Sequence, residues 1–115
     1  MEPIIQADVQ ALINSYANED VYLHLETTNG AYATHFDESF FSVGAYIRNA
    51  FLQYELGKIV GMGPYRVGLK LSIGWVYAEG LTHYEQDAKG RLLMAGLDPA
   101  GKLAVALQIS KTPFE

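Results

Sequence analysis

Apolar side chains near the N-terminus recur at intervals of three and four residues, which is the spacing of one face of a helix. The positions are Ile5, Val9, Leu12, Ile13 and Tyr16. Pro3 suits the first turn of a helix, because its missing N–H would have no partner there. Asn18 can adopt the left-handed conformation that ends many helices. The pattern therefore predicts one helix over about residues 4–16.

Apolar and polar residues then alternate over residues 21–26, which is typical of a strand with one buried face. Asn29-Gly30 follows, and this pair favours a two-residue hairpin turn, since both turn positions need a positive φ. Such a turn fixes the register of the two strands. We therefore expect His35 to lie opposite His24, on the same face as Glu26.

Residues 41–60 fit two patterns. Their apolar positions would form a stripe on a helix: Val43, Tyr46, Ile47, Ala50, Phe51 and Tyr54. Two glycines and the enrichment in β-branched and aromatic residues favour strands instead. We interpret the segment as two strands, at about 43–48 and 51–60, that bend near Asn49.

Turns that contain glycine divide the rest of the chain into short segments. We expect turns at 61–64, 72–74, 87–90 and 98–101, and strands at 65–71, 75–84, 91–95 and 102–110. Pro99 and Gly101 fit a type I turn in a final hairpin. About seven strands after one helix predict a mainly β protein, folded as a small antiparallel β-barrel or a curled sheet. We expect a single domain over 1–115 that is β-rich from 20 to 112.

The composition limits the class of protein. A chain of 115 residues with 50% hydrophobic residues can form one small core without crosslinks, and it has no cysteine for disulfides or thiolate-bound metals. Its net charge of −5 disfavours nucleic acid and anionic lipid as partners. No apolar stretch reaches the roughly 18 residues of a membrane span, and the acidic Glu2 and Asp8 are unlike a secretory signal. We expect a cytoplasmic protein that binds neither nucleic acid nor membranes.

Several segments resemble the YojF-like family of small bacterial proteins. They are VYLHLETT (21–28), AYIRNA (45–50), GPYRVGLK (63–70), VYAEGLT (76–82), RLLMAG (91–96) and GKLA (101–104). The resemblance extends from about Asp8 to Phe114. It implies a mainly β, homodimeric protein from a Bacillus-type bacterium, and it supports strands rather than a helix over 43–60.

The resemblance implies no activity, because the family is one of unknown function without established catalytic residues. Members of the family tend to be encoded beside a sugar-amide deacetylase of bacillithiol synthesis. This context suggests an accessory role with the deacetylase as a partner.

His24 and His35 are the sharpest candidate site. In the expected hairpin their Cβ atoms would be about 4.5–5.5 Å apart. Two imidazoles, with Glu26 or Asp37 on the same face, could then bind a divalent metal such as zinc. The alternative is a solvated sheet face that carries two histidines and holds no cofactor.

A second candidate is one face of a predicted strand. Period-two spacing places together Trp75, Tyr77, Glu79, Leu81, His83 and Glu85. A bulge at Gly80 would shift the phase of the residues after it. Glu79, if buried among these neighbours, could act as a general base with His83 nearby. In the alternative interpretation the aromatic residues pack in a dimer interface or over the core, and Glu79 pairs with Arg48 or Arg66.

A third candidate is a cationic cluster. Arg66 and Lys70 flank Gly68 on one strand face, and we expect Arg48 nearby. With Glu79 beside them, these residues could bind a small ligand through its carboxylate or phosphate. Alternatively, the charges only solvate an edge strand.

Two functions follow from these observations. The first is a non-catalytic accessory or binding protein that acts as a homodimer, because tyrosine, tryptophan and methionine are common in interfaces. The second is a small metal-binding protein, or a metal-dependent enzyme, centred on His24 and His35.

Overall fold

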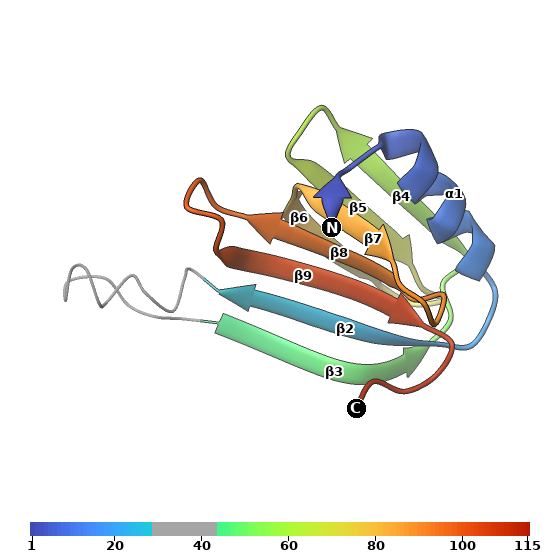
Figure 1. Ribbon diagram of the computed structural model, residues 1–115. Coiled ribbons are helices and arrows are strands. Elements are labelled where there is room, and N and C mark those ends of the chain that lie inside the picture. The colour runs from blue at the N-terminus through green and yellow to red at the C-terminus, as the bar shows by residue number, and fades with distance from the viewer. Residues whose placement is uncertain (29–43) are drawn as a thin grey trace.

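The computed structural model describes residues 1–28 and 44–115. In this part of the chain there are one helix and nine strands, which form two antiparallel sheets (Figure 1). The elements are β1 (Glu2–Pro3), α1 (Gln6–Tyr16), β2 (Val21–Thr28), β3 (Gly44–Leu52), β4 (Leu56–Gly61), β5 (Tyr65–Lys70), β6 (Trp75–Leu81), β7 (His83–Gln86), β8 (Leu92–Leu97) and β9 (Leu103–Ser110). The mainly β class with one helix is confirmed. The predicted barrel or curled sheet is confirmed only as far as its antiparallel strands, because the described strands form two sheets and no closed barrel.

The larger sheet has the strand order β1-β7-β8-β9-β2-β3, and the smaller sheet has the order β4-β5-β6. In Figure 1 the smaller sheet lies behind the larger one, with α1 along β4. The core between these layers contains buried side chains from both sheets and from the helix, among them Ile13, Leu23, Leu69 and Leu107. No helix of the described residues is long and apolar enough to cross a membrane.

The helix forms where the periodicity places it. Val9, Ile13 and Tyr16 are buried along one face of α1, and Asn18 has the left-handed φ of 64° expected at the helix end. The helix also covers the edge of β4. The Gln10 side chain donates to the Gly57 carbonyl at 2.9 Å and accepts from the backbone N–H of Ile59 at 3.0 Å.

The predicted strand 75–84 is two strands in different sheets. The chain leaves the small sheet after Leu81 and enters the large sheet at His83. Thr82, between them, donates its N–H to the Ala95 carbonyl at 2.9 Å, and its hydroxyl accepts from the N–H of Leu97 at 3.0 Å. The alternation alone does not show this change, because it indicates which residues share a face and not which strands pair.

Residues 44–61 form two strands, as expected, but the break is not at Asn49. Asn49 has a φ of 58° and is the extra residue of a β-bulge, so β3 continues through it. The break lies at residues 53–55, where the buried Tyr54 accepts a backbone hydrogen bond from Asn18 at 2.8 Å. The positive φ of Asn49 therefore belongs to a bulge within β3 and not to a bend between two strands.

The strand β2 has a neighbour on each side. β2 pairs with β3 along one edge and with β9 along the other, so His24 lies opposite Arg48 and Gln108. His35, Asp37 and Gly30 lie outside the described residues.

The C-terminal hairpin is confirmed, with β8 and β9 joined by a turn at 98–101. The Asp98 carbonyl accepts from the N–H of Gly101 at 2.8 Å. Its carboxylate accepts from the N–H groups of Ala100 and Lys102 at 2.9 Å each. Asp at the first position of a turn forms such bonds regularly, which is why local chemistry predicts this loop.

The two sheets approach each other closely at Gly96 of β8. A methyl group at this position would overlap the carbonyl oxygen of Gly80 in β6 and come within 2.5 Å of a Val105 methyl carbon. We expect Gly96→Ala to lower the free energy of unfolding by about 3 kcal/mol, because the overlapped atoms belong to the backbone and to the core.

Urea unfolding checks this expectation. Gly74→Ala is the matched control, because a methyl group there meets no atom within 4 Å and only the positive φ of 90° opposes it. The control should lose about 1 kcal/mol. Equal losses in the two variants would contradict the proposed close contact of the sheets.

Candidate functional site

One face of the small sheet is turned away from the core and presents nine residues, which we call the outer face. They are Leu56, Lys58, Val60, Arg66, Gly68, Lys70, Trp75, Tyr77 and Glu79. The strand register arranges them in three rows: Leu56-Lys70-Trp75, Lys58-Gly68-Tyr77 and Val60-Arg66-Glu79. The opposite face carries buried residues such as Ile59 and Val67. The alternation of the strands thus gives the sheet one core side and one exposed side.

Two aromatic side chains dominate the outer face. Trp75 is 49% exposed and Tyr77 is 46% exposed. Their ring planes lie within 5° of parallel, with centroids 5.5 Å apart. The Tyr77 ring lies over Gly68 of the neighbouring strand, where a side-chain carbon would come within 2.9 Å of it. The missing side chain of Gly68 therefore lets the tyrosine lie against the sheet.

The charges of the outer face differ in sign from those of the whole chain. Lys58, Arg66 and Lys70 give it three cations, against one carboxylate from Glu79. The Arg66 guanidinium lies 4.5 Å from the Tyr77 ring centroid and 3.6 Å from the Glu79 carboxylate. Lys70 pairs at 3.1 Å with Glu55, which precedes β4. These pairs are exposed, so each contributes well under about 1 kcal/mol to stability and can open for a ligand.

The predicted anion site is brought together only in part. Arg66, Lys70 and Glu79 share the outer face, as expected. Arg48 is not part of this face; it belongs to β3 of the large sheet and contacts His24, Phe114 and Glu115.

The predicted acid–base face is divided by the fold. Glu79 is exposed beside Arg66, so the burial expected for a general base is missing. Gly80, with a φ of 84°, forms the bulge that the sequence suggested, and Leu81 beyond it is buried on the opposite face. His83 lies in the other sheet, with its Nδ1 atom 2.7 Å from the Thr82 hydroxyl. The ion pair of Glu79 with Arg66 was the alternative interpretation, and it is the one observed.

Sequence reasoning missed Leu56, Lys58 and Val60 on the outer face. A signal was present, because the three residues alternate with Gly57 and the buried Ile59. What the alternation did not show was that β5, rather than another strand, would lie beside them.

A second cluster surrounds His24, which is buried. Its Nε2 atom lies 3.2 Å from the Glu26 carboxylate, and its Nδ1 atom lies 3.2 Å from the Arg48 guanidinium. Because arginine can only donate, Nδ1 accepts and Nε2 carries the proton that Glu26 accepts. Both ring nitrogens are thereby engaged within the protein. The structure thus brings His24 and Glu26 together as a hydrogen-bonded pair.

The metal-binding hypothesis stays a prediction. Among the described residues no group of three or more histidine or carboxylate side chains could hold a metal ion, and His35 is not one of these residues. A metal on His24 would have to displace either Glu26 or Arg48 from an imidazole nitrogen.

The C-terminal residues cover the His24 cluster, which the sequence did not indicate. The Asn49 side chain donates to the Phe114 carbonyl and accepts from the Phe114 N–H, both at 2.7 Å. The buried Phe114 ring lies between the guanidinium groups of Arg48 and Arg91, at 5.3 and 5.5 Å. A single apolar residue near the end of a chain has no periodicity that could predict this contact.

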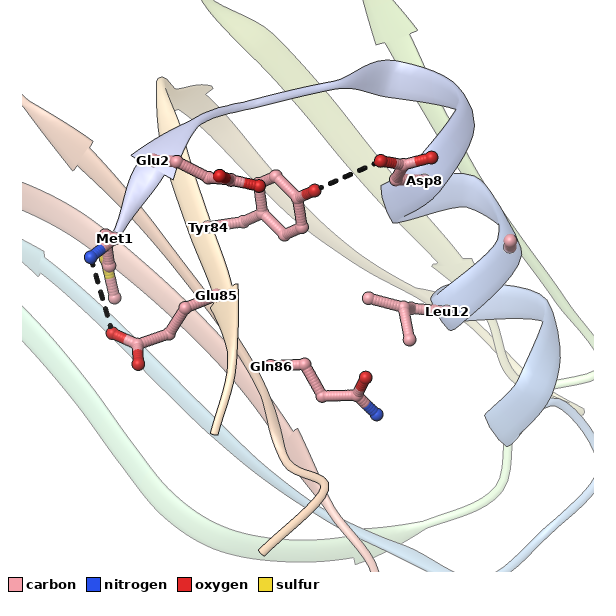
Figure 2. A pocket seen from close by; sticks show the side chains of 8 residues that line it. Met1, Glu2, Asp8, Leu12, Tyr84, Glu85 and Gln86 are labelled. Carbon is pink, nitrogen blue, oxygen red and sulfur yellow. Dashed lines mark hydrogen bonds and ion pairs between the residues drawn. The ribbon is translucent and has the colours of Figure 1, made fainter. Parts of the chain in front are cut away.

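An open cleft of about 720 Å³ lies between α1 and the strands β1 and β7 (Figure 2). It is lined by Met1, Glu2, Asp8, Ala11, Leu12, Tyr84, Glu85 and Gln86. Figure 2 shows the Tyr84 hydroxyl pointing toward Asp8, to which it donates at 3.4 Å. The Met1 amine lies 3.7 Å from the Glu85 carboxylate. Three carboxylates make this cleft unfavourable for anions, in contrast to the outer face.

The chain belongs to the family described as "Protein of unknown function (DUF1806)", which matches residues 3–114. It is 58% identical over 114 residues to the uncharacterized protein YojF of Bacillus subtilis (strain 168), with 99% of this chain and 98% of the relative covered. The crystal structure of the Bacillus subtilis YojF protein matches with a TM-score of 0.81 and 52% identity, over 99% of this chain and 96% of that one. The resemblance noted in the sequence is confirmed.

The surroundings of Tyr84 in the cleft predict a raised pKa of its phenol. Burial of the phenol, followed by the nearby carboxylates of Glu2 and Asp8, raises the pKa of Tyr84 from 10 to about 12. Because the folded protein holds this proton more tightly than the unfolded chain, the contribution to stability is full below pH 10 and is lost as the pH rises toward 12.

Tyrosinate absorbance, followed together with circular dichroism, measures this shift. The difference in tyrosinate absorbance between the native protein and Tyr84→Phe should titrate with a midpoint near pH 12. The double substitution Glu2→Gln and Asp8→Asn should lower that midpoint. Glu85→Gln is the control, since its carboxylate faces the Met1 amine and is absent from the causes of the shift. A midpoint near 10 in the folded native protein would refute the account of the cleft.

Proposed function

We propose that this protein is a non-catalytic accessory protein that binds a partner protein through the outer face of its small sheet. The observation that carries the proposal is the pair Trp75 and Tyr77, half exposed and parallel on a sheet whose other side is in the core. Tryptophan, tyrosine and arginine are the residue types that contribute most binding energy in protein interfaces. The outer face has all three, with Arg66 against Tyr77.

The rows of the outer face support a protein partner rather than a small substrate. The aromatic pair lies on β6, and two exposed aliphatic residues, Leu56 and Val60, lie on β4, so exposed apolar side chains stand on both outer strands of the small sheet. These side chains are exposed on an open sheet face, whereas sites for small molecules are usually concave. Aromatic and arginine side chains are enriched in protein interfaces.

The charges of the outer face define the chemistry of the partner surface. Lys58, Arg66 and Lys70 exceed the single carboxylate of Glu79, although the whole chain has a net charge of −5. A partner patch with exposed carboxylates around an apolar centre would complement this face. Such complementarity speeds association and selects the partner, while the apolar centre supplies most of the affinity.

The family context suggests which partner to test first. The resemblance to the YojF-like family implies a neighbouring sugar-amide deacetylase of bacillithiol synthesis. We propose this enzyme as the partner, with the present protein as its accessory subunit. What supports the choice is the family membership together with a surface suited to docking.

Titration calorimetry with the purified deacetylase tests the proposal. The native protein should bind at micromolar concentrations, and Trp75→Ala should weaken binding by at least about 30-fold, as expected for a tryptophan that supplies a large share of the binding energy of an interface. Lys58→Glu with Lys70→Glu should also weaken binding and reduce its dependence on salt.

Met62→Ala is the matched control, because Met62 is 97% exposed in the turn between β4 and β5 but is not part of the outer face. Its affinity should equal that of the native protein. The proposal is refuted if the native protein shows no binding at about 100 μM, or if Trp75→Ala binds as tightly as the native protein.

A further inference from the structure

Besides the acidic cleft, a smaller pocket lies where the C-terminal end of α1, the loop between β7 and β8, and the end of β9 meet (Figure 1). Its volume is about 300 Å³, at the lower limit of the range of small-molecule sites. It is lined by Ser15, Tyr16, Gln86, Lys89, Gly90, Ser110, Lys111 and Thr112. Two of these residues are lysines and none has a carboxylate, although the whole chain has a net charge of −5. The pocket therefore has the charge of an anion site, in contrast to the cleft.

Hydrogen bonds within the chain fix the loop that carries Lys89. The Asp87 carboxylate accepts from the N–H of Lys89 at 3.0 Å, from the N–H of Arg91 at 2.9 Å and from the Arg91 guanidinium at 2.5 Å. The Tyr16 hydroxyl donates to the Gly90 carbonyl and so ties the loop to the helix. The one carboxylate of the 87–91 loop is thus engaged with Arg91, and the backbone at Lys89 is held in place.

The two lysines of the pocket are available to an anion. Among the described residues no carboxylate pairs with the Lys89 ammonium. The Lys111 ammonium lies 3.1 Å from the Glu19 carboxylate, and both of these side chains are about half exposed. An exposed pair of this kind contributes little to stability and can open for a ligand. An anion in the pocket would therefore meet one unpaired ammonium group and one that is weakly paired.

The hydroxyl protons of Ser110 and Thr112 have no close acceptor among the described residues. Ser110 is only 1% exposed, and its oxygen accepts from the Thr112 N–H at 3.1 Å. The two hydroxyl oxygens are 3.4 Å apart. An O–H···O hydrogen bond is usually about 2.5–3.0 Å long, so this contact is weak. An oxygen atom of a ligand would give these protons a closer acceptor.

The end of the helix does not oppose an anion strongly. The last carbonyl groups of a helix carry a partial negative charge. Here the carbonyls of Ile13, Asn14 and Tyr16 accept hydrogen bonds from the Tyr54 hydroxyl and from the N–H groups of Ala17 and Glu19. Most of the free carbonyl groups at this end are thus occupied, and the two lysines dominate the charge of the pocket.

We propose that this pocket binds the phosphate group of a small phosphate monoester. Such a group carries a charge of about −1.5 to −2 at pH 7, which the ammonium groups of Lys89 and Lys111 balance. Its oxygens accept from the hydroxyls of Ser110 and Thr112, whose protons otherwise have only the 3.4 Å contact. This inference goes beyond the proposed docking role, because the pocket and the outer face are formed by different elements.

Titration of the ¹⁵N-labelled full chain with glycerol 3-phosphate, followed by NMR, tests the proposal. The amide signals of residues 89, 90 and 110–112 should shift, with a dissociation constant below about 1 mM. Lys89→Gln and Lys111→Gln change exposed side chains and should keep the fold. Each should weaken binding about 10-fold, as expected for the loss of one hydrogen bond between charged groups. Lys89→Arg keeps the charge and should bind like the native protein.

Lys58→Gln is the matched control, because it removes one cation from the outer face and none from the pocket. Its dissociation constant should equal that of the native protein. Glycerol and succinate, which lack a phosphate group, should not shift the signals of the pocket residues. A dissociation constant above about 1 mM, unchanged binding by the Lys89→Gln and Lys111→Gln variants, an equal loss in Lys58→Gln, or equal binding of succinate would overturn the inference. No arm of the experiment involves the deacetylase, so the docking proposal stands or fails separately.

Discussion

The contact between Gly96 and Gly80 joins the two sheets backbone to backbone. With no side chain at Gly96, the β8 strand lies against the Gly80 carbonyl of β6. Thr82, two residues after Gly80, then bonds to both Ala95 and Leu97 of β8. The chain can therefore leave one sheet and enter the other within a single residue. This junction determines which face of the small sheet packs in the core and which face stays exposed.

Because of this junction, one side of the small sheet is buried and the other is exposed. The side toward β8, β9 and α1 takes the buried residues, such as Ile59, Val67 and Leu69. The opposite side is left exposed, and there the same alternation places Trp75 and Tyr77. Since a sheet packed on one side has little freedom to rearrange, the outer face is preformed in the free protein. Preformed surfaces of this kind lose little entropy on binding.

Features that depend on a few neighbouring residues could be predicted from the sequence. The helix ends beside a left-handed Asn18, the 98–101 turn is organised by Asp98, and Gly80 forms a bulge. Features that depend on which strands meet could not. The pattern of residues 75–84 is uniform, although the fold divides it between two sheets at Thr82. For the same reason the predicted barrel or curled sheet did not anticipate that the described strands form two sheets.

In the candidate sites too, contacts between neighbouring strands could be predicted from the sequence, and contacts that depend on which strands pair could not. Arg66 and Glu79 come together as expected because adjacent strands carry them, joined by a turn that the sequence indicates. Arg48 was grouped with them by charge alone, yet β3 pairs with β2, and this places Arg48 beside His24. Local turn chemistry predicts His35 as the neighbour of His24, and His35 lies outside the described residues; among the described strands, β3 and β9 pair with β2 and place Arg48 and Gln108 opposite His24. Long-range pairing thus decided the surroundings of each functional candidate.

Native-state hydrogen exchange tests most directly whether the small sheet is a fixed part of the fold. If the junction holds the sheets together, the slowest amides of β5 and β6 should open with free energies within about 1 kcal/mol of those in β2 and β9, because all of them require global unfolding. If the amides of β5 and β6 instead open at several kcal/mol less, the small sheet separates on its own. The outer face would then not be a preformed binding surface.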